Sequence, residues 1–181
     1  MAAPSALQHI PADPPIRIGI STCLLGENVR HDGSHKRNAF LTDVLAQYVE
    51  WVPVCPEFEM GLGVPRESMQ LESKNNLIQL VEIKSRIDHT KTMNQWSKKR
   101  LRKLTSEDLC GYILKKDSPS CGLAHIRVYD QNGVPFRTGH GLFAEALVSR
   151  FPNIPVEEED RLQNPRFRES FIECAFAYRR L

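Results

Sequence analysis

Residues 17–26 read Arg-Ile-Gly-Ile-Ser-Thr-Cys-Leu-Leu-Gly, a short apolar run that gives way to a turn at Cys23. The isoleucines on either side of the glycine predict a buried strand over residues 17–22. Cys55 follows a second such run, predicted as a strand over residues 49–54, and Cys121 comes shortly after a third, over residues 111–115. Carboxyl ends of parallel strands meet at one edge of a sheet, where open α/β proteins bind ligands. We therefore expect the three thiols to converge.

The rest of the chain alternates between helical and strand patterns. Apolar residues recur at helical spacing over residues 36–48, 90–110, 142–151 and 164–180, and further strands are predicted over residues 77–83 and 126–129. This alternation predicts an α/β fold, a single domain with a mostly parallel sheet flanked by helices on both faces. The domain is expected to span residues 16–181, after a flexible leader over residues 1–15 that is rich in proline and alanine.

The composition favours a cytoplasmic protein. No apolar stretch approaches the roughly 20 residues that cross a bilayer, and the start of the chain lacks the charged and apolar regions of a secretory signal. The net charge of +2 is too small to indicate nucleic-acid binding by electrostatics alone. Thiols stay reduced in the cytosol, so the five cysteines do not predict a disulfide framework. Cys110, near a predicted helix end, and Cys174, on an apolar helix face, are expected to be structural.

Three converging thiolates suit two kinds of metal site. Zinc takes a fourth ligand or a catalytic water, whereas an iron–sulfur cluster held by three cysteines leaves one iron open. The pattern does not choose between these, and a lone catalytic thiol at Cys23 or Cys121 remains a third reading, although neither has a convincing histidine partner. The plainest alternative is that all five cysteines are small buried hydrophobes.

Residues beside the predicted thiol site are suited to proton chemistry. Glu57 lies two residues after Cys55 and is a candidate general acid or base. Ser118 and Ser120 stand just before Cys121, where a hydroxyl can orient a base edge or a water, although such a segment is also ordinary turn chemistry.

The polar loop after the first strand is a candidate ligand-binding segment. Arg30, Asp32 and Lys36 within it are predicted substrate contacts, and Arg30, Lys36 and Arg66 are candidates for contacting a phosphate. The basic run over residues 98–103 is expected to be a solvated helix face.

Five motifs together resemble the thiouracil desulfidase (TudS) family, and they cover nearly the whole chain from residue 16. In chain order they are Ile-Ser-Thr-Cys-Leu-Leu-Gly-Glu-Asn-Val-Arg-His-Asp-Gly (residues 20–33), Trp-Val-Pro-Val-Cys-Pro-Glu (51–57), Gly-Leu-Gly-Val-Pro-Arg-Glu (61–67), Ile-Leu-Lys-Lys-Asp-Ser-Pro-Ser-Cys-Gly-Leu (113–123) and Gly-His-Gly-Leu-Phe-Ala (139–144).

The resemblance implies a cytoplasmic, non-redox enzyme with a 4Fe–4S cluster that has one iron without a protein ligand. By motif match, the cluster ligands are Cys23, Cys55 and Cys121. Members of the family remove sulfur from thiolated uracil bases or thiouridine nucleotides, which gives the oxo base and hydrogen sulfide. The acidic residue and the serine that assist in the family map onto Glu57 and Ser118, with Ser120 as the other candidate serine.

The partners expected on this basis are small thiolated pyrimidine bases or nucleotides, with no membrane and no protein partner. Two alternatives stay open: a desulfidase of thiolated tRNA, and a sensor or binding protein whose cluster or metal is not catalytic.

Overall fold

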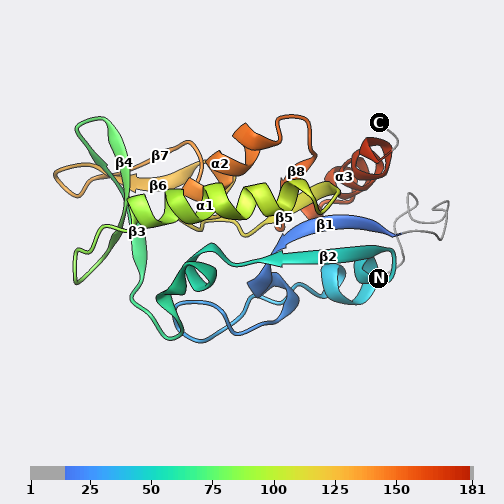
Figure 1. Ribbon diagram of the computed structural model, residues 1–181, viewed down its shortest axis with the longest axis horizontal. Coiled ribbons are helices and arrows are strands. Elements are labelled where there is room, and N and C mark those ends of the chain that lie inside the picture. The colour runs from blue at the N-terminus through green and yellow to red at the C-terminus, as the bar shows by residue number, and fades with distance from the viewer. Residues whose placement is uncertain (1–14, 180–181) are drawn as a thin grey trace.

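The computed structural model describes residues 15–179, so almost all of the predicted leader lies outside the described residues (Figure 1). At its centre is a parallel sheet in the order β2-β1-β5-β8, and all three strand pairs are parallel. Its strands are β1 (Ile16–Ser21), β2 (Val49–Val54), β5 (Leu109–Leu114) and β8 (Val156–Glu158). The predicted α/β class is confirmed.

Helices cover both faces of this sheet. One face packs against α1 (Thr90–Thr105) and α2 (Leu142–Arg150), and the other against α3 (Pro165–Tyr178) and two short helical turns. Strand β5 shows why, because its side chains alternate between the faces: Tyr112 packs against Phe143 of α2, with ring centroids 6.0 Å apart, whereas Ile113 joins the cluster that contains Phe171 of α3. Period-two alternation of apolar residues thus supplies two cores from one strand.

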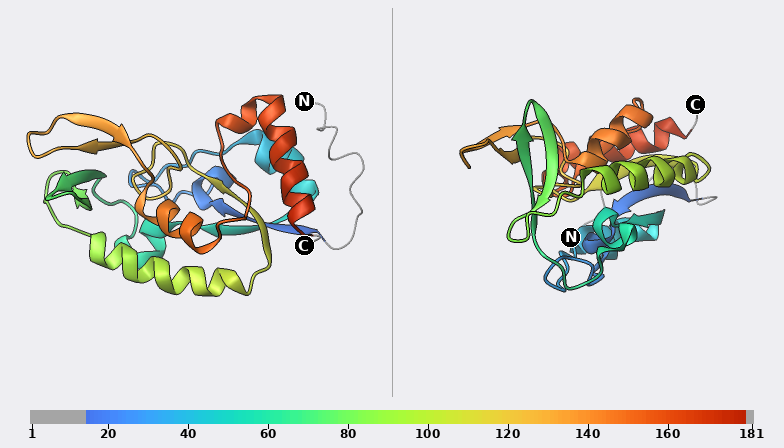
Figure 2. Two further views of the ribbon diagram at one scale, coloured as in Figure 1. Left: turned by 90° about the horizontal axis from the view of Figure 1, so that it is seen from above. Right: turned by 60° about the vertical axis from the view of Figure 1, so that its left-hand side comes forward.

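A second, mixed sheet lies beyond the carboxyl ends of β1 and β2, at the end of the molecule opposite to α3 (Figures 1 and 2). It has the order β4-β3-β6-β7, in which β3 and β6 are parallel and the outer pairs antiparallel. Its strands are β3 (Met69–Lys74), β4 (Leu77–Glu82), β6 (Ile126–Tyr129) and β7 (Pro135–Thr138). The sequence predicted β4 and β6 but neither β3 nor β7, and it did not separate the second sheet from the first.

Two helical predictions were too long. In place of one helix over residues 36–48, the chain forms η3 (Phe40–Val44) and η4 (Leu45–Gln47), with a kink at Val44, where φ is −111°. The helix predicted over residues 90–110 ends at Thr105, because Asp108 turns the chain with a φ of 50° and the next residues enter β5. Cys110 is therefore buried in a strand.

The prediction of a core position for Cys174 was wrong, because this residue is exposed. The buried side of α3 is formed by Phe171, Ile172 and Ala175, and Phe171 and Ala175 lie over Gly111 of β5. No helix of residues 15–179 is long and apolar enough to cross a membrane.

Candidate active site

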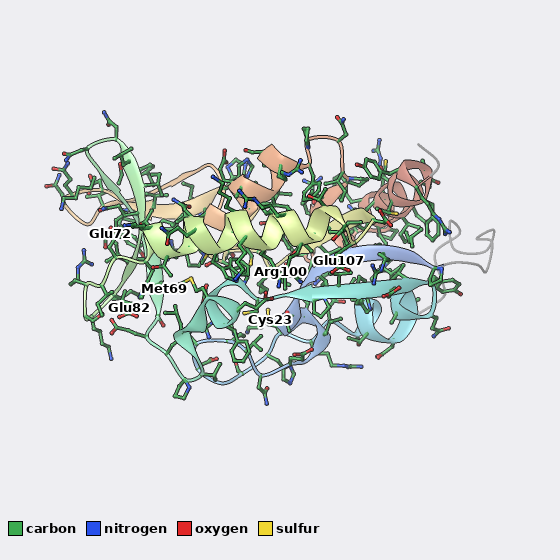
Figure 3. The ribbon with its side chains drawn as sticks, viewed as in Figure 1. Cys23, Met69, Glu72, Glu82, Arg100 and Glu107 are labelled. Carbon is green, nitrogen blue, oxygen red and sulfur yellow. The ribbon has the colours of Figure 1, made fainter. Side chains whose placement is uncertain are left out.

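The three predicted cysteines lie around one cavity at the carboxyl edge of the parallel sheet. Cys23 lies in η2 (Thr22–Leu25), the turn that follows β1, and Cys55 comes directly after β2. Cys121 lies in the loop after β5, and β1 stands between the other two strands. All three line a cavity of about 240 Å³. In Figure 3, Cys23 is drawn below α1, near the carboxyl end of β2.

Burial keeps these thiols protonated when no metal is bound. It raises the pKa of Cys23 to about 11, it raises the pKa of Cys55, and it raises the pKa of Cys121 well above the usual value. The neighbouring thiols raise the pKa of Cys121 further, whereas Lys115 and Arg30 act in the opposite direction on the pKa of Cys23. Loading of a metal centre here therefore has to release protons, and the two cations favour that step.

The arrangement of donors is informative about the kind of centre. Among residues 15–179, no three His, Cys, Asp or Glu side chains lie close enough together to hold a single metal ion. Three sulfurs on one zinc ion would lie roughly 3.8 Å apart, given Zn–S bonds of about 2.3 Å. Thiols that surround a cavity instead suit a polynuclear cluster, in which each thiolate binds a different iron. The residues present therefore fit an iron–sulfur cluster better than a mononuclear site.

Glu57 enters the cavity wall just before η5 (Phe58–Leu62), and its carboxylate is held from two sides. Its Oε2 accepts hydrogen bonds from Nε and Nη2 of Arg66, at 3.1 and 2.7 Å. Its Oε1 accepts one from the hydroxyl of Ser120, at 2.8 Å. The sequence offered Arg66 as a phosphate contact, but in the structure its guanidinium is engaged with Glu57.

The two serines before Cys121 have different surroundings. The Ser118 hydroxyl oxygen accepts the backbone N–H groups of Ser120 and Cys121, at 3.2 and 3.0 Å, and Ser118 lines the cavity. With both lone pairs engaged, this hydroxyl acts as a donor. Ser120 is fully buried behind the cavity wall, where it donates to Glu57.

The predicted substrate contacts occupy different places around the cavity. Arg30 lines it, and its Nε donates to the Ser34 hydroxyl at 3.2 Å. Asp32 accepts the hydroxyl and the backbone N–H of Ser34, which lowers the pKa of this exposed carboxyl to about 2 and orders the loop. Lys36 has an exposed side chain, and its backbone N–H donates to the Cys23 carbonyl at 2.9 Å. Roles of these three residues in substrate binding stay predictions.

Sequence reasoning missed Lys115 as a cavity residue. It follows β5 directly, its ammonium group is paired with Glu159, and its backbone N–H donates to the Ser21 hydroxyl at 3.0 Å. The signal was available, because Lys115 stands at the end of a predicted strand, at the same sheet edge as the cysteines.

Comparisons with known proteins agree with this geometry. A family model described as 2-thiouracil desulfurase matches residues 18–159, a span that contains the three cavity cysteines, Glu57 and both serines. The chain is 28% identical over 145 residues to the uncharacterized protein YbbK of Bacillus subtilis (strain 168), a match that covers 77% of this chain and 95% of YbbK. It also resembles a solved structure described as the 4Fe–4S-dependent thiouracil desulfidase TudS, with a TM-score of 0.64 and 30% identity. That match covers 86% of this chain and 98% of the other.

Proposed function

The chain belongs to the 2-thiouracil desulfurase family, and from that premise we propose that it removes sulfur from thiolated uracil bases or thiouridine nucleotides. The products are the oxo base and hydrogen sulfide. The observation that carries the proposal is the single cavity lined by Cys23, Cys55, Cys121 and the carboxylate of Glu57. We place the reaction in the cytoplasm, where thiols remain reduced.

In this proposal, Cys23, Cys55 and Cys121 hold a 4Fe–4S cluster and leave one iron without a protein ligand. When bound, the cluster supplies a Lewis acid and an acceptor for the substrate sulfur. Two features support the assignment: the three buried thiols surround one cavity, and the similar solved structure is described as 4Fe–4S-dependent.

The reaction exchanges the C=S bond for C=O with water as the co-reactant, so no electrons are gained or lost. Glu57 takes a proton from the water that attacks the ring carbon, through the lone pair that its contacts leave open on Oε1. Ser118 donates a hydrogen bond to the substrate, because its oxygen is occupied by two backbone N–H groups. The proton that Glu57 takes up leaves with the sulfide.

The ends of the substrate are met by residues from separate loops. Arg30 and the flanking polar loop with Asp32 and Lys36 bind the part of the substrate that carries its polar groups, the base edge or a nucleotide phosphate. Arg30 lines the cavity beside the cysteines, which supports this role.

The test is anaerobic purification and cluster reconstitution, followed by iron and sulfide counts and a sulfide-release assay. The substrates to compare are 2-thiouracil, 4-thiouracil, 4-thiouridine monophosphate and a thiolated tRNA. We expect about four irons per chain, as a 4Fe–4S cluster requires, together with sulfide release. A brown protein that releases no sulfide from any of the four would indicate a sensor. Zinc, or full activity without metal, would overturn the proposal.

A further inference from the structure

The carboxylate of Glu57 has only one lone pair left for chemistry. An ionised carboxylate offers about four acceptor positions on its two oxygens. Arg66 fills both positions of Oε2, and Ser120 fills one position of Oε1. The remaining position on Oε1 is therefore the one that can accept a proton from a bound water.

Arg66 is itself held in place on three sides. Its Nη1 donates to the Gly63 carbonyl at 2.9 Å, and its backbone N–H donates to the His31 carbonyl at 2.8 Å. The Arg66 side chain is 5% exposed and that of Glu57 is 16% exposed. A buried ion pair contributes little net stability relative to apolar packing, so stability is a weak reason for placing one in a cavity wall. Two donors from one planar guanidinium also fix the orientation of the carboxylate, which a lysine ammonium does not do.

Ser120 is anchored by the first turn of α2. Its carbonyl accepts the backbone N–H groups of Phe143 and Ala144, at 3.0 and 3.1 Å. Gly141 makes this approach possible, because a Cβ at that position would lie 2.6 Å from the Ser120 carbonyl carbon and oxygen. The motif at residues 139–144 therefore has a structural reason: it holds the loop that connects Ser120 to Cys121.

We infer that Arg66 and Ser120 are positioning residues of the reaction, which orient Glu57 so that a single lone pair of Oε1 takes the proton. This inference rests on the proposed function. Arg66 acts on the substrate only through Glu57, and Ser120 joins Glu57 to the loop of Cys121, so that base and metal site are placed by one network.

The test is a double-mutant cycle on the reconstituted holoenzyme with whichever of the four substrates it turns over. We expect Arg66→Gln to lower kcat roughly 10- to 100-fold, the loss found when one acid–base contribution is impaired, and to leave KM and iron content unchanged. Glu57→Gln should lose more. On the Glu57→Gln background, Arg66→Gln should cause no further loss, because residues that act as a unit are not additive.

Two further variants separate positioning from general structure. Ser120→Ala should lower kcat with iron content retained. Arg86→Gln is the matched control, because Arg86 also binds a glutamate, Glu72, through two nitrogens, but in the second sheet, and it should leave kcat unchanged.

The outcomes distinguish the inference from the proposed function. A wild-type holoenzyme that releases no sulfide refutes the function. An active wild type in which Arg66→Gln retains full kcat, loses its iron, or adds its loss to that of Glu57→Gln refutes the positioning role.

Discussion

Gly19 of β1 and Tyr112 of β5 are partners across the parallel ladder, and the tyrosine ring lies directly over the glycine. A Cβ at Gly19 would stand 2.2 Å from two ring carbons. The ring in turn packs against Phe143, at the start of α2. The absence of a side chain at Gly19 thus lets α2 approach the central strands and support the loop that carries Cys121.

Gly19→Ala is expected to destabilise the protein by about 3 kcal/mol, near the upper end of overpacking costs. The Tyr112 ring is fully buried and has no space to retreat. Urea unfolding measures the effect. Gly111→Ala is the matched control, because its nearest contact would be 3.1 Å from the end of the Phe171 ring, and it should cost clearly less. Equal losses for the two variants would contradict the explanation.

Tyr112→Phe is expected to raise the free energy of unfolding by roughly 1 kcal/mol. The Tyr112 hydroxyl is buried and has no hydrogen-bond partner in the described part of the chain, and burial raises its pKa well above the usual value. Removal of an unsatisfied buried hydroxyl relieves its desolvation cost. Thermal unfolding of the two proteins at pH 7 measures the difference, and a less stable variant would show that the hydroxyl is bonded after all.

Single serine substitutions should divide the cysteines into two groups. The variants of Cys23, Cys55 and Cys121 should each lose most of the reconstituted iron, because each removes one ligand. Cys110→Ser and Cys174→Ser should retain it, since Cys110 lies within β5 and Cys174 is exposed on α3. Iron counts and the visible spectrum provide the measurement. A loss of iron at Cys110 as complete as at the other three would overturn the ligand assignment.

The metal-free protein should lose stability as the pH rises from about 9 to about 11. The folded state holds the pKa of Cys23 near 11, above the 9.0 of an unperturbed thiol, so the unfolded chain releases this proton first. The contribution of Cys23 is therefore fully present below pH 9 and is lost as the pH approaches 11. A shift of two units corresponds to at most about 3 kcal/mol.

Urea midpoints of the metal-free protein between pH 8 and 11 test this expectation. Cys23→Ala, which has no thiol to titrate at this position, should show a smaller decline. An identical decline in the two proteins would mean that Cys23 does not contribute.

The parts of the structure that could be predicted are those that local pattern determines. The strand that ends before Cys55 follows from an apolar run closed by a proline, and the gathering of the three cysteines follows from the order of parallel strands. Strand β7 has only four residues and begins with proline, so it carries no periodic signal.

The remaining features depend on packing between distant segments. Cys174 is exposed because Gly111 determines which side of α3 packs on the sheet, a contact that the helical pattern does not contain. The contacts of Glu57 with Arg66 and Ser120 likewise depend on the path of two loops, and neither partner is marked as such by its own segment.

The anchoring of Ser120 by α2 also bears on the order in which the protein is made. Cys23 and Cys55 leave the ribosome early, but the loop of Cys121 is held by a helix that emerges later still. At about 5–20 residues per second, several seconds pass between the second thiol and the third. During that interval the nascent chain offers only two of its three ligands, so maturation of the iron centre is deferred until the polypeptide has been synthesised through α2.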